Sequence, residues 1–433
     1  MKDFFIHKIS SARTIQEATV LYRLSEPFLP ACKFVLASDL GVEPGFSVNQ
    51  DFSAGAAVRS LFHSKKVWVL DKSTLDEMGD GPAVFPIDYS ISLDTQALSY
   101  LEPFIAGNIQ RVPEDYAEVF RFISQDNVFV DPIPYCHENL RNISADENTE
   151  KIFDKLKAYE VLRNIDEKLL AEEGIIRSKV PESDLVKGAQ EHMGRMYMNL
   201  GNKKFMDTLN FRHQFMYCLL LKMALIQLNN PKKSTYNKII AFMDFCDEDL
   251  ATLGGREIAV AKAYFEKGQG FAFFGKIQKS KEDIFEVLDG MAWDLWHVRF
   301  LEEAMTISPD PRARYFFPSI LTFDKRFIEV IDLYPLKSLA YVEGENRPMP
   351  FYDGDWFSLV EDDLGKQDKI AQRYYSTESV ASRDRRRSSC ELKLDSTVIG
   401  LEEELNKLCP KAKPLRKRGH PLADPASPGT WEM

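Results

Sequence analysis

The sequence predicts an α/β protein built on a parallel sheet flanked by helices. Short apolar runs set off by Gly and Pro, such as Val67 to Leu70, are typical of strands. A long middle segment instead places its apolar residues at helical spacing. Acidic residues follow two of the expected strands, at the sheet edge where open α/β sheets bind ligands. At 433 residues, the chain can form two or three structural units.

Composition and charge exclude several classes of protein. The net charge of −11 argues against a general nucleic-acid coat, because non-specific binding depends on many Lys and Arg contacts to phosphate. No apolar run is long enough to span a membrane or to act as a secretion signal. The six cysteines are scattered singly, without zinc-ligand spacing, which is typical of reduced thiols in a cytoplasmic protein.

The sequence pattern divides the chain into five parts. Residues 1–84 mix strands and short helices, and we expect them to pack on a core formed by 85–145 and 282–345. Residues 146–281 have the spacing of helices and form an expected insertion. Residues 346–375 form an extension. Residues 376–433 are polar and rich in Arg and Lys, so we expect a mostly disordered basic tail in which only Gly400 to Cys409 forms a helix.

The first informative segment places an acid at the end of a strand. From 87 to 94, apolar and polar residues alternate, and Asp94 follows the last apolar residue, Leu93. Thr95 suits a helix N-cap, and Ala97 and Leu98 start the helix that follows. Asp94 is therefore expected at the carboxyl end of a strand.

The second segment places an acid on a helix face. Val287, Met291, Asp294 and Val298 fall on one stripe, so Asp294 has apolar neighbours and needs a partner for its charge. Gly290, one turn earlier, leaves room beside it for a cation, a substrate or a closely packed helix.

The third segment repeats the pattern of the first. Residues 316–322 form an expected strand that ends at Thr322, and a turn at Asp324 leads into a helix through Ile328 and Ile331. Asp324 is a second carboxylate at a strand end.

Together the three segments resemble the PIN-like nuclease family. The resemblance rests on Asp94 with Thr95 and Gln96, on Asp294 with His297, and on Thr322 with Asp324. Gln96 stands where the family usually has Asn. The family also supplies an acid from a helix after its second strand, and the matching segment around 128–139 makes Glu138 the candidate, with Glu257 as the runner-up.

The resemblance implies a metal-dependent nuclease. The catalytic and metal-binding acids would be Asp94, Glu138, Asp294 and Asp324. The residues that surround and orient these acids would be Thr95, Gln96, His297 and Thr322. Carboxylate oxygens are the ligands that Mg²⁺ and Mn²⁺ prefer. The implied substrate is RNA or DNA, with RNA favoured, and the implied setting is a toxin or defence effector.

Other interpretations of the same residues stay open. Asp94 and Asp324 can be helix caps, and Asp294 can form a buried pair with Arg299 or Arg314. His297 can be a core histidine, and Lys325 and Arg326 a solvated helix start. The chain would then be a non-catalytic PIN-like scaffold whose helical insertion binds another protein, or an unrelated helical binding module.

Overall fold

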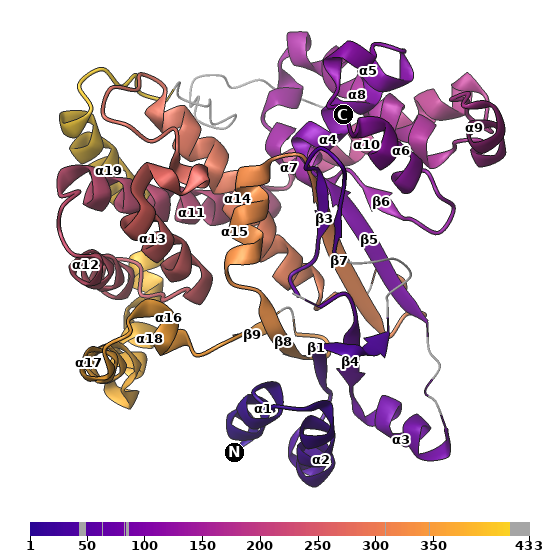
Figure 1. Cartoon of the computed structure of the whole chain (residues 1–433). Coiled ribbons are helices and arrows are strands. Elements are labelled where there is room, and N and C mark those ends of the chain that lie inside the picture. Colours follow the sequence, from indigo (N-terminus) through magenta and orange to yellow (C-terminus); the bar gives the residue numbers. More distant parts are fainter. Residues whose placement is uncertain are drawn as a thin grey trace, which may run out of the picture.

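The computed structural model describes residues 1–42, 49–62, 64–81, 83, 86–307, 309–345 and 347–415. Its central feature is a mixed sheet with strand order β2-β3-β7-β5-β6, which crosses the middle of the molecule (Figure 1). The members of this sheet are β2 (Gln50–Asp51), β3 (Ala57–Arg59), β7 (Tyr315–Thr322), β5 (Ile87–Leu93) and β6 (Val130–Asp131).

The sheet is only partly parallel. β5 runs parallel to β7 on one side and to β6 on the other. The expectation of a parallel sheet is wrong for the other two strands, because β3 is antiparallel to β7 and β2 is antiparallel to β3. These two short strands come from the N-terminal segment, whose tight connections suit an antiparallel hairpin. The first 84 residues thus complete the central sheet.

The parallel pairing brings two distant segments of the sequence into register. Leu93 pairs with Leu321, and the amide nitrogen of Asp94 donates a hydrogen bond of 3.1 Å to the Leu321 carbonyl oxygen. The strand end at Thr322 and the helix after it, α15 (Lys325–Leu333), confirm the sequence prediction. Both expected acidic turns therefore lie at the same edge of the sheet.

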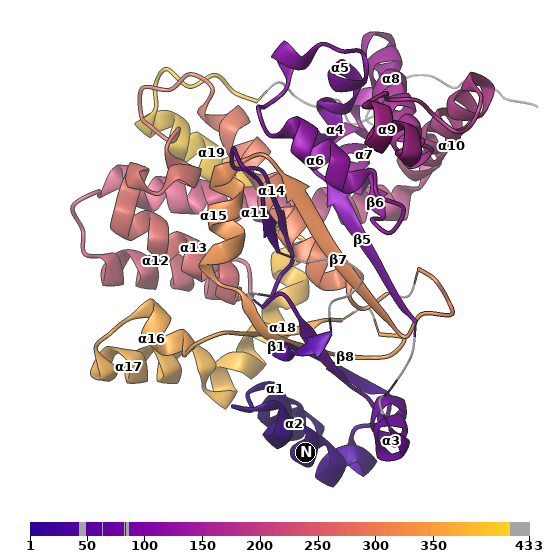
Figure 2. The same ribbon diagram turned by 45° about the vertical axis from the view of Figure 1, so that its right-hand side comes forward.

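A second, antiparallel sheet lies below the first, with strand order β4-β1-β8-β9 (Figure 2). Its strands are β1 (Cys32–Val42), β4 (Val67–Leu70), β8 (Leu336–Val342) and β9 (Met349–Tyr352). α1 (Lys2–Ser10) and α2 (Ile15–Ser25) cover it through a buried cluster that includes Ile9, Tyr22 and Phe34. α3 (Lys72–Asp80) follows β4, and its N-cap is Asp71.

Helices surround the upper and left-hand parts of the sheet in Figure 1. Between β5 and residue 145 lie α4 (Thr95–Ser99), α5 (Leu101–Ile105), α6 (Tyr116–Ile123) and α7 (Ile133–Asn139). The stretch 146–281, for which the sequence predicts helices, contains α8 (Asp146–Arg163), α9 (Glu167–Glu173), α10 (Glu182–Gly201), α11 (Lys203–Asn229), α12 (Thr235–Glu248) and α13 (Gly255–Lys267). α14 (Ile284–Ala304) then returns the chain to β7. α11 packs directly on α14, so the insertion and the core share one apolar interior.

The C-terminal segment differs from the prediction. α16 (Trp356–Val360) and α17 (Leu364–Tyr375) are followed by α18 (Thr377–Glu391), in a region expected to be disordered. α19 (Leu394–Leu408) contains most of the helix expected from Gly400 to Cys409 and begins six residues earlier. α18 is held by the buried Arg383, which donates a hydrogen bond of 2.8 Å to Asp247. α19 packs along α11 with Leu401 and Leu405 buried. The basic cluster from Arg416 to Arg418 lies outside the described residues.

Because α19 is part of the core, truncating one of its buried leucines should destabilise the protein. Leu405 is fully buried, so Leu405→Ala should lower the free energy of unfolding by roughly 2–5 kcal/mol, measured by chemical denaturation. Leu392, which is 88% exposed, supplies the control, since Leu392→Ala should have an effect of about 0.5 kcal/mol or less. Equal effects of the two substitutions would show that α19 does not pack on α11 in solution.

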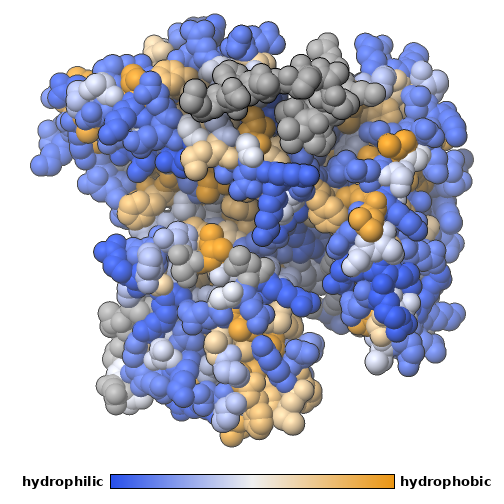
Figure 3. Space-filling model, turned by 180° about the vertical axis from the view of Figure 1, so that it is seen from behind, coloured by the Kyte–Doolittle hydropathy of each residue, from blue (hydrophilic) through white to orange (hydrophobic). Residues whose placement is uncertain are grey.

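The outer surface is mostly hydrophilic. On the face seen in Figure 3, hydrophobic side chains gather over the lower part of the molecule, and exposed apolar residues on α1 and α2 include Phe4, Val20 and Leu24. Among the described residues, none of the helices combines the length and apolar character that a membrane crossing requires.

Candidate functional site

A cavity of about 300 Å³ opens where the two acidic turns meet α7 and α14. All four acids expected from the sequence line it, and we call it the acidic cavity. Its lining comprises Asp94, Thr95, Gln96, Glu138, Phe273, Lys276, Glu286, Val287, Gly290, Met291, Asp294, His297, Asp324, Arg326 and Phe327. The four acids come from four separate segments of the sequence, which converge at the carboxyl ends of the parallel strands, where open α/β sheets bind their ligands.

Asp94 lies at the floor of this cavity and caps a helix at the same time. Its Oδ1 accepts a hydrogen bond of 2.5 Å from the Ala97 amide, so Asp94 is the N-cap of α4, and the prediction that Thr95 caps this helix is wrong. Burial raises the pKa of Asp94 to about 7, and the negative charge of Glu138 adds to this shift. Hydrogen bonds from Thr322 and Ala97 and the nearby His297 oppose it.

Asp294 lies near the middle of α14, on the helix face that the sequence predicts. The expected stripe is present, because Val287, Met291 and Asp294 all line the acidic cavity. Burial raises the pKa of Asp294 well above its usual range, and the charges of neighbouring carboxylates raise it further. Gly290 also lines the cavity, and a Cβ added there would meet open space. Asp294 therefore faces the room that the sequence predicted beside it.

Neither arginine proposed as a buried partner of Asp294 pairs with it among the described residues. Arg299 binds Glu257 and Glu302, and Arg314 binds Glu77. The structure therefore does not contain the buried salt bridge between Asp294 and Arg299 or Arg314 that the sequence left open.

Asp324 is the N-cap of α15 and is paired with Arg326. Its Oδ1 accepts hydrogen bonds of 2.8 Å from both the amide and the Nε of Arg326, and its Oδ2 is in contact with the same guanidinium. Burial acts to raise the pKa of Asp324, but these interactions with Arg326 outweigh it and hold the pKa below its usual value. Thr322 lies behind both acids: its hydroxyl accepts from the Asp324 amide and hydrogen-bonds Asp94.

Glu138 enters the cavity from α7 and pairs with His297. The distance between Glu138 Oε1 and His297 Nε2 is 2.8 Å, and the imidazole is buried. This contact ties α7 to α14 across the cavity. Glu257, the runner-up for the same role, is not in the cavity lining; it forms a two-pronged ion pair with Arg299 beneath α14.

The sequence alone missed the positive residues of the cavity. Lys276 and Arg326 line it together with a fifth carboxylate, Glu286. Arg326 looked like a solvated helix start, and Lys276 lies in a loop with no periodic pattern to place it. The sequence offered one indication that Arg326 belongs to the site, its position two residues after Asp324. At this spacing, the Arg326 side chain can donate to the carboxylate that caps its own helix.

The donor chemistry of the cavity fits a hard divalent cation, because several carboxylates share one partly buried space. Burial raises the pKa of both Asp94 and Asp294, and the neighbouring carboxylates raise it further. The positions of the side chains are not those of an assembled metal site. Within the described residues, no three His, Cys, Asp or Glu side chains are grouped to hold one ion. Asp324 is paired with Arg326, and Glu138 is paired with His297.

Comparison with known proteins gives no match. The search against protein-family models finds no matching family, and the searches of curated proteins and of solved structures also find none. The chemistry and geometry of the acidic cavity are therefore the basis for proposing a function.

Proposed function

We propose that this protein is a metal-dependent nuclease that hydrolyses phosphodiester bonds of RNA, and less readily of DNA, in the acidic cavity. One observation supports this most: the four acids chosen from separate segments of the sequence line a single cavity at the strand ends. Parallel pairing of β5 and β7 accounts for the two strand-end caps, Asp94 and Asp324. Asp294 comes from α14 and adds a further buried carboxylate beside them, although like charges repel one another.

Each acid has a role in this proposal. Asp94, Asp294 and Asp324 would hold Mg²⁺ or Mn²⁺, with Glu138 completing the set. Bound ions of this kind lower the pKa of water and neutralise the oxygens of a phosphodiester. Thr322 orients Asp94 and Asp324, and His297 orients Glu138. Gly290 keeps open the space beside Asp294 in which a substrate phosphate would lie.

The resemblance to PIN-like nucleases agrees with this assignment in residue order and in position at strand ends. A role as a toxin or defence effector follows from the resemblance alone. The cytoplasm is the proposed location, because the cysteines are spaced singly and all six are free thiols.

A non-catalytic scaffold is the second candidate, and a specific observation favours it. Asp324 and Glu138 already have partners in Arg326 and His297, so the cavity has two satisfied ion pairs without a metal. In that case, the helical insertion would bind another protein and the acids would only stabilise the turns.

The two candidates are separated by incubating the purified full chain with single-stranded RNA or DNA and Mg²⁺ or Mn²⁺. We expect cleavage products with either ion, none in the presence of EDTA, and faster cleavage of RNA. A folded protein that cleaves neither nucleic acid with either ion would rule out the nuclease and leave the scaffold.

A further inference from the structure

A second cavity, of about 360 Å³, lies on the other side of the contact between α7 and α14. We call it the aromatic cavity. Its volume falls within the range of roughly 300–1,000 Å³ that is usual for small-molecule sites. Its lining comprises His137, Asn202, Lys204, Phe205, Thr208, Leu209, Arg212, Trp296 and Phe300.

The lining combines rings with positive charge. The ring centroid of His137 lies 5.8 Å from that of Phe205 and 5.5 Å from that of Phe300, and Trp296 lies 6.1 Å from Phe300. Aromatic rings at this spacing offer faces and edges on which a planar heterocycle can stack. The described lining has no acidic residue, although the whole chain has a net charge of −11.

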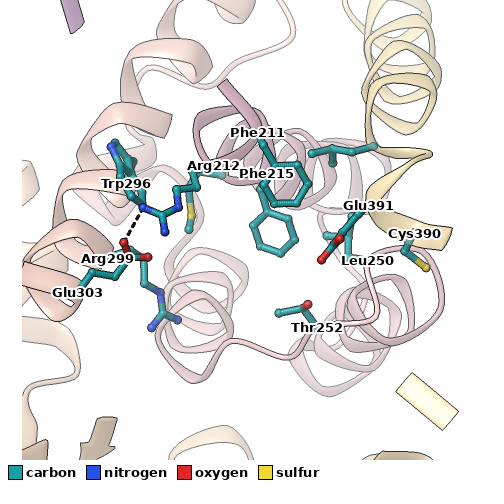
Figure 4. A pocket seen from close by; sticks show the side chains of 12 residues that line it. Phe211, Arg212, Phe215, Leu250, Thr252, Trp296, Arg299, Glu303, Cys390 and Glu391 are labelled. Carbon is teal, nitrogen blue, oxygen red and sulfur yellow. Dashed lines mark ion pairs between the residues drawn. The ribbon is translucent and has the colours of Figure 1, made fainter. Parts of the chain in front are cut away.

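The cationic side chains differ in their availability. Lys204 is exposed at the rim and has no ion pair among the described residues. Arg212 forms an ion pair of 2.5 Å with Glu303 and lies over the Trp296 ring at 4.9 Å. A third cavity, of about 250 Å³, shares Arg212 and Trp296 with the aromatic cavity, and we call it the neighbouring cavity. Figure 4 shows these two side chains side by side in its wall, with Arg212 joined to Glu303. Arg212 thus keeps the indole in place, and Lys204 is the charge that can meet an anion.

The aromatic cavity adjoins the acidic cavity through two pairs of consecutive residues. His137 precedes Glu138 on α7, and Trp296 precedes His297 on α14. In each pair, the first residue lines the aromatic cavity and the second lines the acidic cavity. α7 and α14, which the contact between Glu138 and His297 joins, therefore each line both cavities.

We propose that the aromatic cavity binds a nucleotide, with the base stacked on its rings and the phosphate at Lys204. Asn202 and Thr208 are both exposed. Asn202 Oδ1 caps α11, so its amide nitrogen is the group that can meet the edge of the base. The Thr208 hydroxyl donates to the Lys204 carbonyl oxygen and can still accept from the base or the sugar. As a substrate subsite, this assignment rests on the proposed nuclease function. The ligand is either one nucleotide of a single strand whose backbone continues to the acidic cavity or a free nucleotide that acts as a ligand in its own right.

The test measures binding rather than cleavage. Fluorescence anisotropy with a labelled short oligoadenylate RNA, in EDTA so that it is not cut, reports strand binding, and calorimetric titration with AMP reports free-nucleotide binding. Phe205→Ala should weaken binding roughly 5- to 150-fold, the range for stacking one base on one aromatic side chain. Phe211→Ala is the matched control, because Phe211 is a half-buried phenylalanine of the same helix that lines the neighbouring cavity instead.

Charge reversal provides a second test that does not depend on the core. Lys204→Glu, an exposed substitution, should weaken binding, whereas Lys203→Glu on the same helix and outside the lining should have a smaller effect. Loss of RNA binding alone supports a substrate subsite, and loss of AMP binding as well supports a free-nucleotide site. If neither pair of variants differs for RNA or AMP, the assignment is overturned. If the intact chain never cleaves RNA yet binds it through Lys204 and Phe205, only the nuclease proposal fails.

Discussion

Asp294→Asn is expected to abolish metal-dependent cleavage, with a loss of activity of at least about 100-fold. Substituting a residue that only hydrogen-bonds a metal ligand typically lowers metal affinity or activity roughly 10–100-fold, and Asp294 is proposed as a ligand itself. The same substitution should leave the metal-free protein as stable as before, or more stable. Burial and the charges of Glu138, Asp324 and Asp94 all disfavour the charged form of Asp294, and its pKa is therefore raised. An amide removes that charge and keeps the size of the side chain.

The sign of this stability effect depends on pH. A carboxyl group whose pKa is higher in the folded than in the unfolded chain favours folding at low pH, and this contribution is lost as pH rises. For Asp94, the window runs from its ordinary value of 3.8 to about 7. The loss across this window is at most about 4 kcal/mol. The contribution of Asp94 to the stability of the metal-free protein should therefore be lost between these pH values. Asp94→Asn, which retains the cap, should gain stability relative to the wild type as pH rises through this window.

Asp71 supplies the matched control for these two variants. Like Asp94, it follows a strand, is buried and caps a helix, in this case with a hydrogen bond of 2.6 Å from the Thr74 amide. It lies outside the acidic cavity, so Asp71→Asn should preserve cleavage. Paired measurements of melting temperature and of RNA cleavage with Mg²⁺ or Mn²⁺ distinguish the nuclease from the scaffold. A much lower melting temperature for Asp294→Asn, in a protein that never cleaved nucleic acid, would favour the scaffold.

Glu257→Gln is expected to act in the opposite direction, by destabilising the fold without affecting the chemistry. Glu257 is buried and accepts hydrogen bonds of 2.7 and 2.5 Å from Arg299. Burial acts to raise its pKa, but the charge of Arg299 outweighs burial and lowers it. Removing the negative charge leaves Arg299 with Glu302 as its remaining acidic partner, and breaking a buried pair typically costs roughly 3–5 kcal/mol.

Chemical denaturation at neutral pH measures this loss. Because the pKa of Glu257 is lowered on folding, its contribution to stability is present above the ordinary pKa and disappears as pH falls through the folded-state value. Glu266→Gln is the control on the same helix, since Glu266 forms an exposed pair with Lys262 worth about 1 kcal/mol or less. Lost cleavage with unchanged stability for Glu257→Gln would instead place Glu257 in the reaction.

The local sequence pattern was sufficient to predict the strand ends and the acids beside them. Alternation up to Leu93 and the apolar run up to Thr322 define strands without knowledge of their neighbours, because side chains on a strand alternate between faces. The spacing of Val287, Met291 and Asp294 likewise defines a helix face. These are short-range properties, so Asp94, Asp294 and Asp324 could be chosen from the sequence alone.

Only the tertiary structure decided how these residues are used. The parallel register of β5 and β7 places Asp94 beside Thr322. The sequence left Glu138 and Glu257 as alternative candidates for the same role, and the fold places Glu138 in the acidic cavity, in contact with His297. α18 has too few apolar residues to predict its burial, and it is ordered because Asp247 pairs with Arg383. α19 has apolar residues at helical spacing, but only the fold provides α11 as the helix on which they pack. The partners of a charge or an apolar side chain come from other segments, so sequence periodicity shows which residues need a partner and only the fold supplies it.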